Sequence, residues 1–189
     1  YTLGAAQAQS NQDDALIKLA SELKEQIPTM PQGDVDTIRA WFVDLANQPA
    51  IQTVTELNLE YEQLSEIPAE IGALVNLRKL FLHNNQLSVI PAEIGALLNL
   101  EILELDRNNI SVIPPEIRAL VNLRVLNLDH NQIAVIPAEI GALVNLQRLS
   151  LGGNQIAVIP PEIRALVNLG ELWFINNQMA VIPPEVFDL

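Results

Sequence analysis

Cysteine, aromatic residues and basic residues are all scarce in this sequence. Its 189 residues include no cysteine, 4% aromatic residues, and 10 lysines and arginines against 23 aspartates and glutamates. The absence of cysteine excludes disulfides, cysteine metal sites and thiol nucleophiles. The formal net charge of −13 argues against nucleic acid or an anionic membrane as the partner. The compartment stays open, because a cytoplasmic protein and one secreted into a host cell both fit these facts.

Long apolar runs are also missing. No segment approaches the roughly 18 apolar residues that a transmembrane helix needs, so we expect no membrane insertion. Apolar residues nevertheless make up 49% of the chain, which is enough for one sizeable core or for one solenoid with a small cap. Their regular spacing is the main signal in the sequence.

The apolar residues recur with a period of 23 residues. The stretch from Leu77 to Leu97 reads LRKLFLHNNQLSVIPAEIGAL, and it returns when the frame is shifted by 23 residues. One column shows the constant spacing: Leu57, Leu80, Leu103, Leu126, Leu149 and Leu172. A fixed period of roughly 20 to 29 residues with the pattern L-x-x-L-x-L-x-x-N is typical of a leucine-rich repeat, in which each turn of a solenoid contributes one strand and one short convex helical piece. Such a fold presents a surface, so we expect binding rather than chemistry.

Three further columns have structural explanations. The asparagines are predicted to bond backbone groups in the turn after each strand, which makes them structural rather than ligand-binding. The prolines fix φ where the chain enters the outer arc, and the glutamates place an acid in the first turn of a short helix. The columns are Asn85, Asn108, Asn131, Asn154 and Asn177; Pro68, Pro91, Pro114, Pro137, Pro160 and Pro183; and Glu70, Glu93, Glu116, Glu139, Glu162 and Glu185. In the first repeat Glu62 replaces the asparagine.

The region before the repeats has a different pattern. Residues 1–10 show no periodicity and are predicted to form a disordered tail. Helical spacing then predicts one helix from about Asn11 to Ile27 and a second from Asp34 or Val35 to about Ala46, with Ile38, Trp41, Phe42 and Leu45 on one face. Residues 11–50 are interpreted as a helical cap on the first repeat, because terminal repeats need an end cover. The alternative is a separate helix pair that docks a partner. Residues 51–189 form the repeat domain.

The repeated motif LxxLxLxxNxLxxIPxEIxxLxNL covers residues 54 to 189 and resembles the 23-residue leucine-rich repeat class. This class is found in intracellular Ras-pathway scaffold proteins, in ROCO-type GTPases and in many bacterial repeat proteins. The near-identity of successive repeats looks most like bacterial arrays, including those delivered into host cells. We therefore predict an α/β fold: a right-handed horseshoe arc of six repeats with a parallel concave sheet and a two-helix N-terminal cap.

The concave face is the candidate binding surface. Residues that flank the two central leucines of each repeat point outward from the sheet. They differ from repeat to repeat, whereas the convex half is nearly copied. Six strands about 4.8 Å apart span roughly 25 Å, which suits a protein segment better than a small metabolite. Aromatic anchors and an acidic centre flanked by arginines, including Arg124, lead us to predict partner contacts at Lys79, Phe81, His83, Glu104, Asp106, Arg107, Asn127, Asp129, His130, Arg148 and Trp173.

Catalysis, cofactors and metals are not expected. The two histidines, His83 and His130, lie two repeats and roughly 10 Å apart, too far to share one metal ion. Asp129, His130 and Ser150 could be imagined as a triad, but the face is open and no oxyanion site is signalled. Gly152-Gly153 is not followed by the lysine and helix of a phosphate loop.

The sequence leaves three functions open. The favoured one is recognition of a protein partner by the concave face, as part of a larger bacterial protein. In the second, the array associates with itself through its C-terminal edge, where Phe174, Met179, Val186 and Phe187 replace the residues of earlier repeats. Trimming of a longer chain explains the same edge, and we expect trimming. The third function is the substrate-targeting arm of an enzyme whose catalytic domain lies elsewhere.

Overall fold

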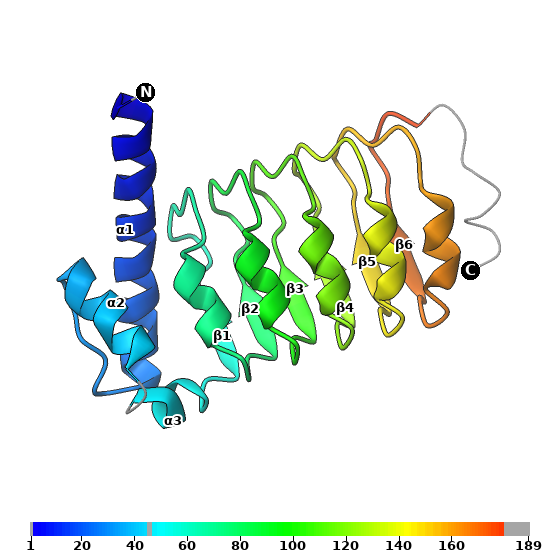
Figure 1. Ribbon diagram of the computed structural model, residues 1–189. Coiled ribbons are helices and arrows are strands. Elements are labelled where there is room, and N and C mark those ends of the chain that lie inside the picture. The colour runs from blue at the N-terminus through cyan, green and yellow to red at the C-terminus, as the bar shows by residue number, and fades with distance from the viewer. Residues whose placement is uncertain (1, 45–46, 180–189) are drawn as a thin grey trace.

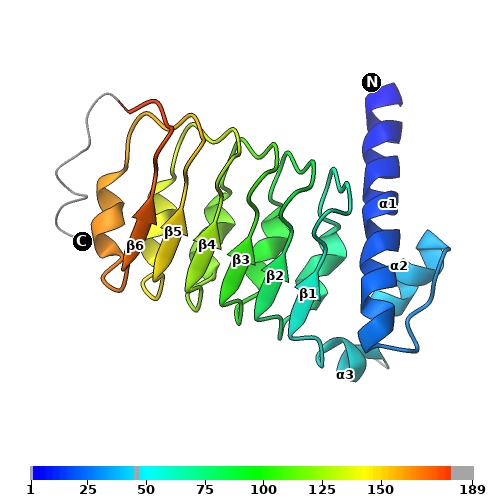
Figure 2. The same ribbon diagram turned by 180° about the vertical axis from the view of Figure 1, so that it is seen from behind.

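The computed structural model describes residues 2–44 and 47–179. Three helices come first: α1 (Thr2–Gln26), α2 (Val35–Val43) and α3 (Gln48–Ile51). Six strands follow, β1 (Glu56–Asn58), β2 (Lys79–Phe81), β3 (Ile102–Glu104), β4 (Val125–Asn127), β5 (Arg148–Ser150) and β6 (Glu171–Trp173). Between the strands lie the 3-10 helices η2 (Ala69–Ala73), η3 (Ala92–Ala96), η4 (Pro115–Ala119), η5 (Ala138–Ala142) and η6 (Pro161–Ala165). The predicted solenoid is confirmed. One parallel sheet in the order β1 to β6 forms one face, and a row of short helices forms the opposite face (Figures 1 and 2).

The core is a stack of leucines and isoleucines. Strand pairing keeps the repeats in step, so that Leu57 lies beside Leu80 and Leu80 beside Leu103. The leucine at the centre of each strand from β1 to β5 is buried, and its two strand neighbours face the other side of the sheet. This alternation brings the variable columns onto one face.

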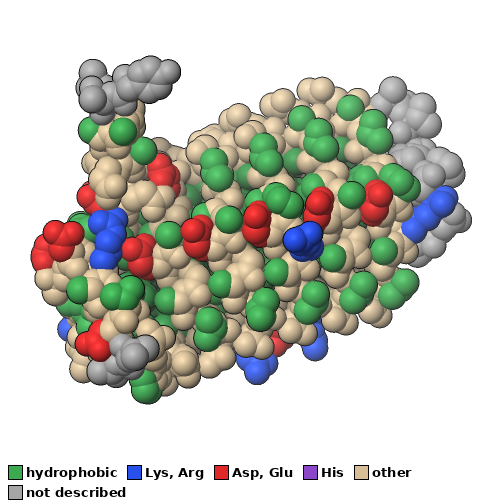
Figure 3. All heavy atoms as spheres, in the orientation of Figure 1, with side chains coloured by type: hydrophobic (Ala, Val, Ile, Leu, Met, Phe, Trp, Pro, Cys, Tyr) green, Lys and Arg blue, Asp and Glu red, His purple; other side chains and the backbone are tan. Residues whose placement is uncertain are grey.

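The convex half forms as its sequence predicts. In every described repeat the proline precedes a 3-10 helix of five residues, and the following isoleucine, such as Ile117, is fully buried. The glutamate lies in the first turn of each helix. Figure 3 shows these acidic side chains as a row along the outer face, between rows of hydrophobic side chains. The outer segment of the sixth repeat, with Val186 and Phe187, lies outside the described residues.

The first helix is longer than predicted. α1 begins at Thr2, where the sequence predicts a disordered tail. Alanine-rich composition favours a helix even without an apolar stripe. The buried part of α1 starts at Ala15. Before it, side-chain hydrogen bonds between residues four apart, from Gln7 to Asn11 (3.1 Å) and from Gln9 to Asp13 (2.8 Å), support the helix. Within the described residues no helix combines the length and the apolar composition of a membrane span.

The N-terminal helices pack against the first repeat. The side chains of Leu16, Leu19 and Leu23 are fully buried, and α1 contacts both α2 and β1. On α2, Ile38 and Phe42 are buried and Trp41 is half-buried, whereas Leu45 lies outside the described residues. The helix α3 is a single turn, and its Ile51 is fully buried.

An ion-pair cluster joins these helices to the repeats. Arg39 of α2 donates to Asp13 of α1 (2.8 Å) and to Glu70 of η2 (3.3 Å). Hydrogen bonds from Gln9 and from Arg39 lower the pKa of Asp13. Glu62, which takes the place of the asparagine in the first repeat, lies 4.0 Å from Lys18 of α1. The position that differs from the other repeats is therefore the one that faces α1.

Candidate functional site

A buried column of asparagines supports the concave face from behind. The Asn131 amide donates to the carbonyls of Leu105 (3.0 Å) and Leu128 (3.1 Å), and its oxygen accepts from the N–H of Ile110 (2.9 Å). Asn85, Asn108 and Asn154 repeat this pattern with the same spacing. The predicted structural role is confirmed, and two of the three bonds reach the preceding repeat. The column therefore ties each turn of the solenoid to the turn before it.

The last outward column of the face has an unusual backbone conformation. Its residues all have positive φ, between 54° and 66°. They are Tyr61, Asn84, Arg107, His130, Gly153 and Asn176. Most donate their N–H to the next repeat, as Arg107 does to Asp129 (2.9 Å), so this conformation extends the strand ladder by one bond. Side chains other than glycine are strained in this region, asparagine and histidine less than most, so the sequence signals it clearly at Gly153 and only weakly at Asn84, His130 and Asn176.

The predicted basic contacts are exposed and paired with acids of neighbouring strands. Lys79 lies 3.0 Å from Glu56, and Arg148 makes two bonds to Glu171, at 2.7 and 3.2 Å. The hydrogen bonds from Arg148 lower the pKa of Glu171, whose side chain remains 47% exposed. Both pairs lie at the start of their strands, so they border the face and leave its centre to other groups.

The structure corrects the position of Arg124. The sequence predicts that this residue flanks the acidic centre, but it directly precedes β4 and lies 4.0 Å from Glu101. It lines a polar groove of about 420 Å³ at the edge of the solenoid, together with Arg78 and a second series of asparagines. Each asparagine of that series donates to a backbone carbonyl 24 residues earlier: Asn76, Asn99, Asn122, Asn145 and Asn168. The groove is thus largely a by-product of this structural ladder.

The aromatic residues of the face differ in their exposure. Trp173 is 53% exposed, and its ring nitrogen donates to Glu171 (3.4 Å). Phe81 is only half-buried, which leaves part of its ring free for contact. Tyr61, 67% exposed, packs edge-on against His83 with ring centroids 5.8 Å apart. The face therefore offers aromatic surface at both ends.

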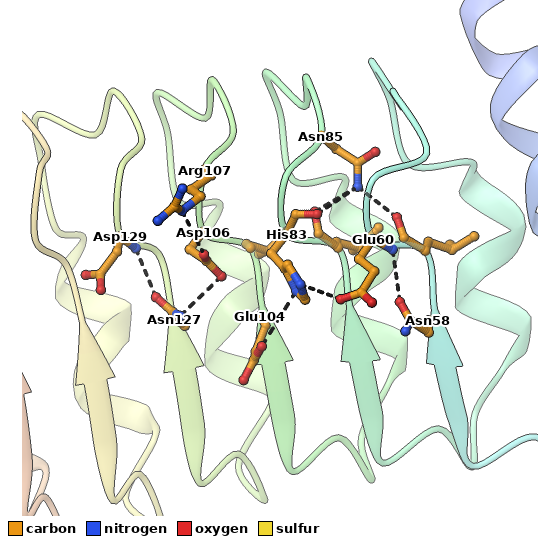
Figure 4. A network of polar contacts seen from close by, with 12 residues as sticks. Asn58, Glu60, His83, Asn85, Glu104, Asp106, Arg107, Asn127 and Asp129 are labelled. Atoms are coloured by element: carbon orange, nitrogen blue, oxygen red, sulfur yellow. Dashed lines mark hydrogen bonds and ion pairs between the residues drawn. The ribbon is translucent and has the colours of Figure 1, made fainter.

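A polar network fills the centre of the face (Figure 4). His83 contacts Glu60 through Nε2 and lies 3.7 Å from Glu104 through Nδ1. Asn127 donates to Asp106 (3.2 Å) and accepts from the N–H of Asp129 (3.1 Å). These contacts bring His83, Glu104 and Asp106 together, an arrangement that sequence reasoning missed. In the sequence, the only partner considered for His83 was His130. Glu104 belongs to a different column of the next repeat, so its closeness to His83 does not follow from the repeat alignment.

Asp129 and His130 lie beside a small hollow. Asp129 accepts from the N–H of Gly152 (2.6 Å), and the His130 ring lies so close to Gly153 that a Cβ there would meet Nδ1 at 2.7 Å. Burial raises the pKa of Asp129, and the nearby charge of Asp106 acts in the same direction. The hollow of about 100 Å³ is closed by Trp173 and its neighbours. Glycine at both positions thus opens a recess that sequence reasoning missed.

The imagined hydrolytic triad does not assemble. The side chain of Ser150 is buried, while His130 is exposed above Gly153. In the part of the chain that the structure describes, no hydrogen bond joins Ser150, His130 and Asp129. The carboxylate of Asp129 instead accepts from the backbone N–H of Gly152.

Comparisons with known proteins agree with this architecture. A sequence model described as "Leucine rich repeat" matches residues 75–133 and 98–156. A leucine-rich-repeat protein of Leptospira interrogans is 36% identical, with a TM-score of 0.58, over 74% of this chain and 41% of that one. The ectodomain of the Arabidopsis thaliana receptor kinase GASSHO1/SCHENGEN3 is 35% identical, with a TM-score of 0.68, over 77% and 18%.

A third solved structure matches along most of its length. The ectodomain of the receptor kinase SOBIR1 from Arabidopsis thaliana is 32% identical, with a TM-score of 0.57, over 67% of this chain and 68% of that one. The chain spans less than half of the Leptospira protein and about a fifth of GASSHO1/SCHENGEN3. No curated protein sequence matches it significantly.

Proposed function

The chain belongs to the leucine-rich repeat family, and from this premise we propose that it is a protein-recognition module that binds a partner on its concave face. The observation that carries the proposal is the contrast between the two faces. Five successive convex segments read either IPAEIGAL or IPPEIRAL, whereas the outward positions of the strands differ in charge, size and aromaticity. Both faces are exposed, so free drift would have changed both.

The chemistry of the face supports a protein partner. Trp173, Phe81 and Tyr61 are residue types enriched at interaction hot spots. Between them lie four carboxylates, Glu60, Glu104, Asp106 and Asp129. The nearest cation at the centre is Arg107, since Lys79 and Arg148 are paired at the border. We therefore infer a partner segment that offers basic side chains between apolar ones.

Two further observations favour this function. The sheet and its asparagine column hold the face in one conformation, which reduces the ordering cost of association. The solved structure of GASSHO1/SCHENGEN3 is a complex with CASPARIAN STRIP INTEGRITY FACTOR 2. The near-identity of the repeats and the likeness to the Leptospira protein support an origin in a larger bacterial protein. In its most specific form, the proposal is that this protein is delivered into a host cell.

A matched pair of triple variants tests the proposal in a pull-down from bacterial and host-cell lysates. The concave variant carries Glu60→Lys, Glu104→Lys and Trp173→Ala, which replaces two acids of the face by bases and removes one aromatic anchor. The convex variant carries Glu93→Lys, Glu116→Lys and Val167→Ala, which changes the net charge equally and also shortens one exposed apolar side chain. We expect a partner that the wild-type and convex chains retain and the concave variant loses, with equal thermal unfolding of all three. A partner lost only by the convex variant would contradict the assignment.

Self-association is the second candidate. The central leucine is fully or almost fully buried in β1 to β5, whereas Leu172 of β6 is half-buried, as are Phe174 and Met179. β6 is the last strand of the sheet among the described residues and leaves one edge unpaired there. Mass measured by light scattering over a hundredfold concentration range separates the candidates. A mass that doubles with concentration supports self-association, and a constant monomer mass removes it.

A further inference from the structure

His83 has a ring nitrogen without a hydrogen-bond partner. Its Nδ1 atom is buried and makes no hydrogen bond, since the nearest carboxylate oxygen, on Glu104, lies 3.7 Å away. Buried polar atoms in native proteins are nearly always paired, and an unpaired one needs an explanation. The position is also singular, because no other adjacent pair of repeats places a histidine beside two carboxylates at these positions.

The surroundings of the ring determine which nitrogen is free to bind. Nε2 contacts the carboxylate of Glu60, which can only accept a hydrogen bond, so Nε2 carries the proton. In the neutral tautomer that donates through Nε2, Nδ1 presents a lone pair 3.7 Å from the Glu104 oxygen. Two acceptors facing each other repel unless a cation lies between them. A carboxylate on one ring nitrogen and a metal ion on the other is the usual arrangement around metal-binding histidines.

A third donor completes the cluster. Asp106 occupies the position of His83 in the next repeat, and one ligand atom each from His83, Glu104 and Asp106 lie within 4.8 Å of one another. Around a tetrahedral Zn²⁺ ion, donors at about 2.1 Å from the metal lie roughly 3.4 Å apart. Side-chain rotations that move each donor atom by about 1 Å would therefore bring all three within bonding distance of one ion. Asn127 holds Asp106 in place by donating to Oδ1 (3.2 Å), as Glu60 holds His83 (Figure 4).

We propose that His83 Nδ1, Glu104 and Asp106 bind a Zn²⁺ ion on the concave face, with Glu60 and Asn127 as orienting residues. One imidazole and two carboxylates suit Zn²⁺, whereas Ca²⁺ and Mg²⁺ prefer oxygen ligands alone. The three protein ligands leave one coordination position, which opens towards the concave side. The proposal is independent of protein recognition, because the ion binds whether or not a partner is present.

Competition with a chromophoric chelator tests the proposal on the chain freed of any affinity tag. We expect one Zn²⁺ per wild-type chain and loss of that site in His83→Gln. His130→Gln is the matched control, because it removes the other histidine of the same face and leaves the cluster intact. Glu60→Gln, which changes only the orienting group, is expected to weaken binding by roughly 10- to 100-fold.

The nearest positive charge gives a test with the opposite sign. Arg107 Nε lies 3.9 Å from Asp106 Oδ2, and its side chain is largely exposed. Arg107→Gln should therefore tighten Zn²⁺ binding, by several-fold at low salt. With Co²⁺ in place of Zn²⁺, the wild-type chain should show the intense visible bands of a four-coordinate ion, and His83→Gln should lack them.

Three results would overturn the proposal. The first is the absence of saturable Zn²⁺ binding to the wild-type chain. The second is binding that His83→Gln and His130→Gln weaken equally. The third is Ca²⁺ binding as tight as Zn²⁺ binding and insensitive to His83→Gln, the behaviour of an acidic surface alone. Circular dichroism and thermal unfolding of every variant confirm that loss of binding does not reflect loss of the fold.

Discussion

Asn131 and Asn127 lie four residues apart on either side of the same sheet, and they serve different purposes. Asn131 is 7% exposed and bonds only backbone groups, which have the same geometry in every repeat. Asn127 is half-buried and bonds the Asp106 side chain and the Asp129 N–H. Equivalents of Asn131 are asparagine in five successive repeats, whereas those of Asn127 are Asn58, Phe81, Glu104, Ser150 and Trp173. A side chain that bonds only backbone groups is therefore determined by the fold. A side chain that bonds other side chains can vary from repeat to repeat, and function can select it.

The largest effect should come from removing an asparagine of the buried column. Asn131→Ala leaves the buried Ile110 N–H without a partner and removes one of the two asparagine donors from the carbonyls of Leu105 and Leu128, which should lower the free energy of unfolding by about 3 kcal/mol. Asn127→Ala, the matched control on the concave side, should cost less than about 1 kcal/mol. Urea unfolding of both variants measures the difference. Equal losses of stability would break the distinction between the two positions.

A second effect concerns the backbone at the edge of the concave face. Arg107 has a φ of 55°, so Arg107→Gly removes strain and should leave the unfolding free energy unchanged or raise it by up to about 1 kcal/mol. Arg124 has no positive φ, and Arg124→Gly should lower stability by about 0.5 to 1 kcal/mol. Urea unfolding of the two glycine variants compares them. If Arg107→Gly destabilises as much as Arg124→Gly, the conformation carries no strain.

The smallest effect depends on pH. Burial raises the pKa of Asp129 above its ordinary value of 3.8, so the folded chain binds a proton that the unfolded chain releases in the window just above 3.8. Stability therefore falls as pH rises through that window, and the cost of the buried charge is fully present at pH 7. Asp129→Asn keeps an acceptor for the Gly152 N–H and removes the charge.

Unfolding of the wild-type chain and Asp129→Asn at pH 7 and at pH 3 measures this effect. We expect the variant to be the more stable at pH 7, with the difference shrinking towards pH 3, where both side chains are neutral. A variant that is less stable than the wild-type chain at pH 7, with a deficit that shrinks towards pH 3, would show instead that the negative charge is stabilising.

The fold could be predicted because its determinants repeat. The 23-residue period, the leucine column and the asparagine column each appear at least five times, so single substitutions such as Glu62 do not hide them. The extent of α1 could not be predicted in the same way. Residues 4–10 are exposed, and the helix there rests on alanine propensity and two exposed side-chain bonds.

The candidate site was only partly predictable. Alternation along the strands is sufficient to place the outward columns on one face. The side-chain contacts between columns depend on rotamers and on the positive φ of the last column, which the residue types of that column signal clearly only at Gly153. For that reason the cluster of His83, Glu104 and Asp106, and the recess over Gly152 and Gly153, emerged only from the structure.

Carboxylate labelling of the chain alone and bound to its captured partner tests the central claim most directly. The two faces carry comparable probes within one molecule: Glu60, Glu104 and Asp129 on the concave side, and Glu93, Glu116 and Glu162 on the convex side. The experiment is run with a chelator present, so that bound metal cannot protect Glu104. Recognition by the concave face predicts that the partner lowers labelling of the first group and leaves the second unchanged. Protection of the convex glutamates alone would contradict it.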